Sequence, residues 1–112
     1  DERRHIDIDV EMEARDDNAP VLLFGIAHGN GLPIYGVSSD MDQVRPLALS
    51  AHRYRFRFEL DLGALLPGEY LLKLHPMDSQ GLRLFATHEV AVVIRGETRE
   101  MGAVRLPHQW RE

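Results

Sequence analysis

The chain contains no cysteine among its 112 residues, and this absence removes several chemistries at once. Disulfide cross-links, a thiolate nucleophile and cysteine-ligated zinc are all excluded. No run approaches the roughly 18 apolar residues of a membrane-spanning helix. No segment keeps the 3.6-residue period of an amphipathic helix for three turns. What is present is a 44% hydrophobic content, which predicts that residues 1–112 form a single small domain.

Lysine is almost absent as well, because Lys73 is the only one and the other 12 of the 13 basic residues are arginine. The formal net charge is −5. Residues 1–17 hold eight acidic residues and three arginines, a difference of −5, so the rest of the chain is balanced. Because nucleic-acid binding requires a basic excess on some face, we expect no nucleic-acid partner for this acidic chain.

Alternation of apolar and charged residues is the dominant pattern of the sequence. In residues 6–13, apolar side chains alternate with aspartate and glutamate, which predicts a half-buried strand. Residues 53–60 show the clearest alternation, with aromatic and leucine side chains inward and Arg53, Arg55 and Arg57 outward. Three arginines are therefore expected on one strand face.

Turn-forming residues divide the rest of the chain into further short strands. These strands are predicted at residues 20–28, at 32–38, from residue 70 onward, within 82–94 with a bulge near His88, and at 101–106. Residues 38–52 lack a clean period and are predicted to form a long loop or an irregular edge. About seven short strands, with turn signals every 8 to 12 residues, indicate an all-β, antiparallel sandwich of immunoglobulin-like type.

Strand parity also predicts the core and the first hairpin. Asn30-Gly31 suits the hairpin turn because both residues tolerate positive φ. Tyr35, just after this turn, either offers its ring to a ligand or packs beneath residues 40–52. The predicted core residues are Ile8, Val10, Phe24, Ile26, Phe56, Phe58, Leu72, Leu74, Val92 and Val104.

The six histidines, at positions 5, 28, 52, 75, 88 and 108, raise the question of a metal site. No two of them are two or four residues apart, the spacings that let one strand or helix present two imidazoles to one ion. The sequence therefore predicts no metal site and no cofactor. A metal site assembled across several strands stays open.

Catalytic patterns are missing too. None of the serines lies in the glycine-flanked elbow of a serine hydrolase, and no phosphate-binding G-x-x-x-x-G-K-[ST] pattern is present. The carboxylates of residues 7–13 have the period of a solvent-facing strand, which favours solubility over glycosidase chemistry. We therefore expect a chain that is not an enzyme.

Recognition is the class that remains, and antiparallel sandwiches commonly bind through one sheet face or the loops at one end. Sugars are held by aromatic rings against their C–H patches and by Arg, His and Tyr groups that hydrogen-bond hydroxyls. Arg53, Lys73 and Arg105 are expected to be exposed and could contact a sugar in addition to the six residues named at the end of this paragraph. For the arginines the alternative is a solvated strand face, and for the tryptophan an aromatic cover at the base of the sandwich. The residues predicted to bind carbohydrate are Tyr35, Arg55, Arg57, His75, His108 and Trp110.

Three segments carry a family resemblance. They are "FGIAHGNGLPIYG" at 24–36, "LLPGEYLLKL" at 65–74 and "GAVRLPHQW" at 102–110. In this order and spacing they resemble the C-terminal domain of the Wzt-type ATP-binding subunit of bacterial O-antigen polysaccharide ABC transporters. The chain lacks that family's N-terminal nucleotide-binding domain and the first strand or two of the sandwich, as expected for an excised C-terminal fragment.

The resemblance implies a carbohydrate-binding module at the cytoplasmic side of the inner membrane of a Gram-negative bacterium. It implies recognition of the lipid-linked O-antigen polysaccharide, coupled to export through the transmembrane permease subunit that the parent protein contacts. A homodimer is expected, with contacts that include residues 101–110. Two alternatives stay open: a module that dimerises the exporter without touching sugar, and a glycan-processing enzyme.

Overall fold

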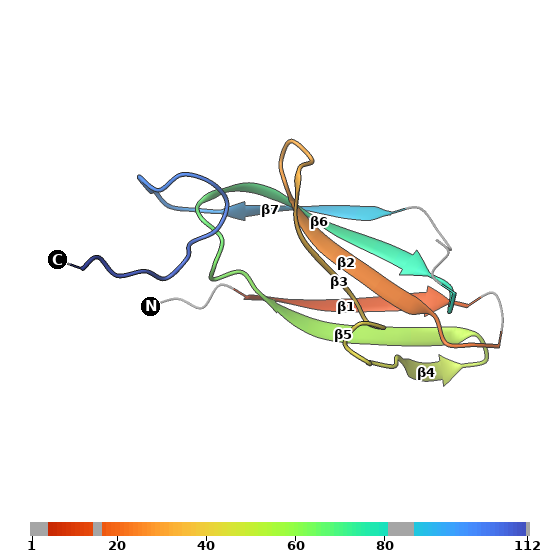
Figure 1. Ribbon diagram of the computed structural model, residues 1–112. Helices are drawn as coiled ribbons and strands as arrows, with labels where there is room; N and C mark the ends of the chain where they lie inside the picture. The colour runs from red at the N-terminus through yellow and green to blue at the C-terminus, as the bar shows by residue number, and fades with distance from the viewer. Residues whose placement is uncertain (1–4, 15–16, 81–86, 112) are drawn as a thin grey trace.

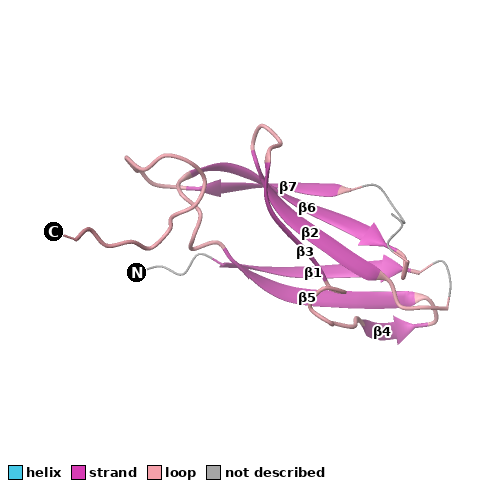
Figure 2. Ribbon diagram, viewed as in Figure 1, coloured by secondary structure: helices cyan, strands magenta, loops and turns pink. Residues whose placement is uncertain are grey.

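The computed structural model describes residues 5–14, 17–80 and 87–111, and every regular element among them is a β-strand (Figures 1 and 2). None of the described residues belongs to a helix long and apolar enough to cross a membrane. The strands are β1 (His5–Glu13), β2 (Val21–His28), β3 (Pro33–Ser38), β4 (Leu47–Ser50), β5 (Arg53–Asp61), β6 (Gly68–Met77) and β7 (His88–Ile94).

The strands form two antiparallel sheets that lie one above the other in Figure 1. One sheet has three strands in the order β1-β5-β4, and the other has four in the order β3-β2-β6-β7. This arrangement confirms the all-β, antiparallel two-sheet architecture predicted from the alternating pattern. β1 and β5 pair over their full length, from His5 opposite Asp61 to Glu13 opposite Arg53.

The core lies between the sheets and consists of two adjoining groups of side chains. In one group Phe56 packs with Met12 and Leu22, and in the other, larger one Ile26 packs with Leu72. Leu74 contacts both groups, and the rings of Phe24 and Phe58 stack across the two sheets with centroids 4.4 Å apart. Nine of the ten predicted core residues are buried in these groups or pack against them.

The tenth, Val104, is a wrong prediction, because its side chain is 41% exposed. Residues 101–106 do not form the predicted strand: only Val104 makes an isolated bridge, to Leu65. Gly102, at φ 104°, turns the chain so that Ala103 faces the core instead. The carbonyl of Ala103 accepts hydrogen bonds from the Leu66 amide and the Tyr70 hydroxyl.

The first hairpin is built on a three-residue loop. The amide of His28 donates to the carbonyl of Leu32, and the amide of Gly31 donates to the carbonyl of His28, both at 2.8 Å. Of the two turn residues that tolerate positive φ, only Gly31 adopts it, at 95°. In a three-residue loop of this kind a type I turn comes first, and only the residue after it is left-handed.

Two other predictions need smaller changes. The segment 38–52, predicted to be a loop or irregular edge, contains the short edge strand β4, whose pairing with β5 is interrupted between Ala48 and Ser50. The predicted strand within 82–94 is present as β7 from His88 onward, but its pairing with β6 stays in register through His88 and Glu89, so the bulge predicted near His88 is wrong. The first part of the predicted strand lies outside the described residues.

Candidate functional site

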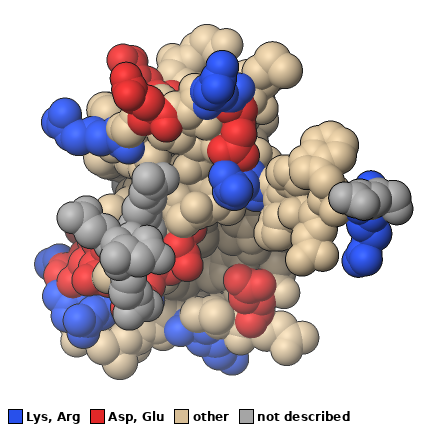
Figure 3. All heavy atoms as spheres, turned by 90° about the vertical axis from the view of Figure 1, so that its left-hand side faces the viewer, with Lys and Arg blue, Asp and Glu red and all other residues tan. Residues whose placement is uncertain are grey.

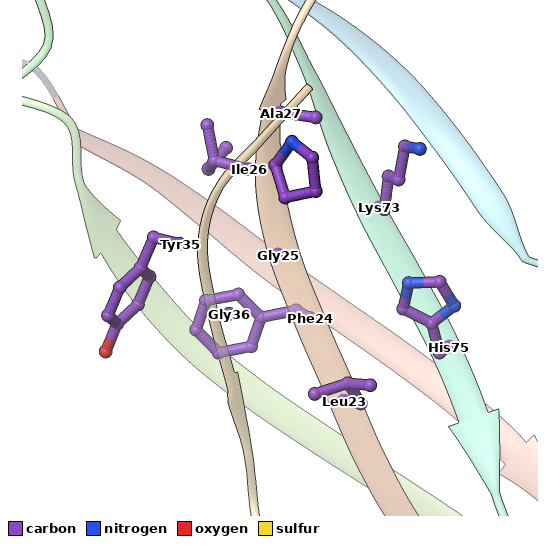
Figure 4. A pocket seen from close by; sticks show the side chains of 10 residues that line it. Leu23, Phe24, Gly25, Ile26, Ala27, Tyr35, Gly36, Lys73 and His75 are labelled. Carbon is purple, nitrogen blue, oxygen red and sulfur yellow. The ribbon is translucent and has the colours of Figure 1, made fainter. Parts of the chain in front are cut away.

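A shallow groove of about 290 Å³ crosses the outer face of the four-stranded sheet (Figure 4). Its floor follows from strand register, because Gly25 on β2 lies opposite Gly36 on β3 and also opposite Lys73 on β6. Two neighbouring glycines leave the sheet without side chains at this point. Leu23 and Ala27 on β2, with Pro33 on β3, give the groove an apolar lining.

The two floor glycines are required for different reasons. A Cβ atom on Gly25 would lie 2.9 Å from the carbonyl oxygen of Tyr35, a backbone clash that only a shift of β3 could relieve. A Cβ atom on Gly36 would meet nothing closer than the carbonyl oxygen of Phe24, at 3.6 Å, which is ordinary van der Waals contact. Gly25 therefore serves strand packing, whereas Gly36 keeps the groove open.

Hydrogen-bonding groups stand along the β6 side of the groove. Lys73 and His75 are two residues apart on β6, so their side chains project from the same face (Figure 4). The Nζ atom of Lys73 lies 3.6 Å from Oε2 of Glu89 on β7. The Nδ1 atom of His75 lies 2.8 Å from the hydroxyl of Thr87. Each of these two side chains at the rim therefore has a polar contact with a residue on β7 or next to it.

Tyr35 stands on the opposite side of the groove, at the edge strand β3. The pairing of β2 with β3 shifts register between Ile26 and Ala27, so that Ile34 is an extra residue. Ile34 packs against the core, and Tyr35 is 58% exposed. Its ring extends away from β2 (Figure 4).

Arg55 and Arg57 lie on the other sheet. Arg55 is engaged by two carboxylates of β1: its Nε lies 3.1 Å from Asp9 and its Nη2 lies 2.9 Å from Glu11. Arg57 is exposed and faces Asp9 in the register. The arginines of β5 therefore face the carboxylates of β1 in a cross-strand charge ladder.

His108 and Trp110 lie in the C-terminal tail, which leaves the sandwich as an extended chain (Figure 1). Their rings meet edge to face with centroids 6.1 Å apart, and Trp110 is 92% exposed. Trp110 therefore does not cover the base of the sandwich. Of the six predicted residues, the structure brings Tyr35 and His75 to one groove and places the other four elsewhere.

The sequence reasoning did not recognise the glycine floor as a site. The residue that lies opposite Gly25 across the hairpin depends on the extra residue Ile34. Counting outward from the turn without that bulge would pair Gly25 with Tyr35, one residue away from the true register.

The end of the molecule that carries both termini shows acidic and basic side chains side by side, with no extended field of one sign (Figure 3).

Comparison of the chain with protein-family models and with curated proteins finds no match.

Proposed function

We propose that this chain binds a glycan without catalysing a reaction, and that the glycan lies in the groove over Gly25 and Gly36. The observation that carries the proposal is the combination of a side-chain-free floor, an apolar lining and hydrogen-bond donors on one rim. The C–H face of a sugar ring suits the floor, and its hydroxyls suit Lys73 and His75. Tyr35 supplies an accessible ring at the far edge.

The groove fits a small part of a polymer better than a large ligand. Its volume lies at the lower end of the roughly 300–1,000 Å³ that is usual for ligand sites. A groove open along a sheet also lets a chain continue at either side. A terminal segment of a polysaccharide is the ligand that matches both properties.

The sequence resemblance supplies the biological setting of the proposal. On that basis the glycan is the lipid-linked O-antigen polysaccharide, and the chain acts in the cytoplasm beside the inner membrane as part of an ABC exporter. Its other partner would be the permease subunit, reached through the parent protein. Because the chain is acidic overall, nucleic acid is not an expected partner.

We also propose that the topology is immunoglobulin-like. The strand order supports this: β1, β5 and β4 correspond to strands B, E and D, and β3, β2, β6 and β7 correspond to C′, C, F and G. Tyr70, near the start of β6, supports it too. Its hydroxyl donates to the carbonyl of Leu66, which lies four residues upstream. Such a tyrosine corner recurs at this position in immunoglobulin-like sandwiches.

The homodimer remains part of the proposal and rests on the tail. Met101, Leu106 and Trp110 are exposed apolar side chains in one short segment. The radius of gyration is 16.6 Å, against about 13 Å for a compact domain of this length, as an extended tail requires. A tail of this kind can pack on a second copy. Light scattering tests this: a dimer that dissociates when the chain ends at Arg99 supports it, and a monomeric intact chain contradicts it.

Calorimetric titration with the producing strain's O-polysaccharide, and with an unrelated polysaccharide, tests the glycan proposal. Gly36→Val fills the groove without a close backbone contact and should weaken binding at least about tenfold, or about 1.4 kcal/mol. Ala91→Val adds similar bulk to exposed β7 and should leave binding unchanged. If neither polysaccharide binds, the result would favour the alternative, a module that assembles the exporter without touching sugar. Turnover of the polysaccharide would identify an enzyme.

A further inference from the structure

The outer face of the three-stranded sheet carries a ladder of charged pairs between β1 and β5. Three successive rows pair an acid on β1 with an arginine on β5: Glu13 with Arg53, Glu11 with Arg55 and Asp9 with Arg57. Opposite charges directly across a strand pair stabilise a sheet. Over these three rows the face neutralises itself.

The ladder changes character in the next row. Asp7 lies directly opposite Glu59, and in the row beyond it His5 lies opposite Asp61. Like charges directly opposite each other destabilise a strand pair. No ion pair joins Asp7 or Glu59 to a cation among residues 5–14, 17–80 and 87–111. The repulsion in this row is therefore not relieved within the described part of the chain.

The side chains in these two rows also converge. A ring nitrogen of His5 and carboxylate oxygens of Asp7 and Glu59 all lie within 4.8 Å of one another. Ligands at 2.0–2.2 Å from a shared zinc ion are about 3.5 Å apart. All three side chains are exposed, so small rotamer changes close the remaining distance without moving either strand.

We propose that His5, Asp7 and Glu59 bind a divalent transition-metal ion of the zinc type. The cation relieves the acid–acid row, and the imidazole selects a borderline metal over calcium or magnesium, which prefer all-oxygen sites. The strand register fixes the three Cα positions, and the remaining coordination positions are taken by water. The ion joins the edge strand β1 to β5 on the face opposite the glycine groove.

The site needs side chains from two strands, and this explains why histidine spacing alone did not predict it. His5 and Asp7 share a face of β1 at a separation of two residues, and Glu59 comes from a position 52 residues further along than Asp7. Only the register of β1 with β5 brings the third ligand into place. The proposal does not depend on glycan binding.

Titration of the isolated chain with Zn²⁺, followed by amide NMR, tests the proposal. We expect one saturable site whose shifts concentrate at residues 5–8 and 58–61. His5→Ala and Glu59→Gln should each weaken binding at least about tenfold, the lower limit for loss of a residue that supports a metal site. Glu13→Gln removes the same charge from an arginine-paired row, and His88→Ala removes an exposed histidine on β7. Neither control should change the affinity.

Four outcomes would overturn the proposal: Zn²⁺ shifts confined to other histidines, unchanged affinity in His5→Ala, equal losses in Glu13→Gln and Glu59→Gln, and equal or tighter binding of Ca²⁺. The substituted side chains are exposed, and circular dichroism establishes that each variant is folded. A rise in the melting temperature with Zn²⁺, absent in Glu59→Gln, would support the proposal independently, since a ligand that binds only the folded state stabilises it.

Discussion

The two outer faces of this sandwich are built from similar strands but differ in how their side chains are used. On the three-stranded sheet, the outward residues of β1 and β5 are nearly all charged and mostly pair across the strands. On the four-stranded sheet, the row that crosses the middle runs from Gly36 through Gly25 to Lys73 and Glu89, so half of it has no side chain.

The charged side chains of the three-stranded sheet mostly face partners of opposite charge, whereas the four-stranded sheet leaves an open groove with an apolar lining. Arg55 lies in ion-pair distance of both Asp9 and Glu11 and donates a hydrogen bond from Nη2 to Glu11, so a sugar hydroxyl would have to compete with two carboxylates. The glycine groove presents no such competition at its floor, because backbone and apolar side chains line it. Arginine count alone is therefore a poor guide to which face could bind a ligand.

Both faces depend on the core between them, and the largest effect is expected there. Phe56→Ala should lower the free energy of unfolding by about 3–5 kcal/mol, because a buried ring between Met12 and Leu22 leaves a cavity. Val104→Ala is the control: this exposed side chain should cost below about 0.5 kcal/mol. Urea denaturation measures both, and similar losses would mean that the tail is part of the core.

The connection from β5 to β6 joins the two sheets, and Tyr70 holds it in place. The buried hydroxyl of Tyr70 donates its one hydrogen mainly to the carbonyl of Leu66, and the carbonyl of Ala103 shares it at 3.3 Å. Tyr70→Phe leaves these carbonyls without this donor and should cost about 1–3 kcal/mol. Tyr35→Phe, at an exposed ring, should cost much less. If urea denaturation shows the same loss of unfolding free energy in both variants, the hydroxyl of Tyr70 does not hold this connection in place.

The same tyrosine makes stability depend on pH in the alkaline range. Burial raises the pKa of Tyr70 above its ordinary value. The unfolded chain therefore loses this proton from about pH 10, while the folded chain keeps it, so the free energy of unfolding falls as the pH rises from there to the folded pKa. Denaturation between pH 8 and 11 should show the fall in the native chain and a smaller one in Tyr70→Phe. If Tyr70→Phe shows the same fall in the free energy of unfolding as the native chain, other titratable groups cause the pH dependence.

Alternation in the sequence, together with the turn residues, was enough to predict every observed strand except the short β4 and most of the core, because these strands have one wet face and one buried face. It failed at Val104, where no strand period exists and a left-handed glycine two residues earlier sets the side-chain direction. The groove could not be predicted in this way, because it depends on the register between two strands and not on the pattern within one strand. Its floor is a pairing across β2 and β3, and the extra residue Ile34 shifts that pairing by one position.

A reciprocal pair of variants tests the comparison of the faces directly. His75→Ala should weaken glycan binding about tenfold, or about 1.4 kcal/mol, with little change in stability. Arg55→Ala should leave glycan binding unchanged and lower stability by about 0.2–1 kcal/mol, because it removes two partly exposed ion pairs. Calorimetric titration and urea denaturation measure the two quantities. Loss of binding in Arg55→Ala would move the glycan site to the three-stranded sheet.

The smallest effect concerns the one acid–acid row of the charge ladder. Glu59→Arg replaces the like-charged pair with Asp7 by an opposite-charged one, and so continues the pattern of the three neighbouring rows. Stability without metal should rise by about 0.2–1 kcal/mol, and Glu59→Gln, which only removes the repulsion, should gain less. Urea denaturation in the presence of a chelator measures both at low salt, where screening is weak. A loss of stability in Glu59→Arg would show that Asp7 and Glu59 are already compensated in the metal-free chain, and that the row imposes no cost for a cation to relieve.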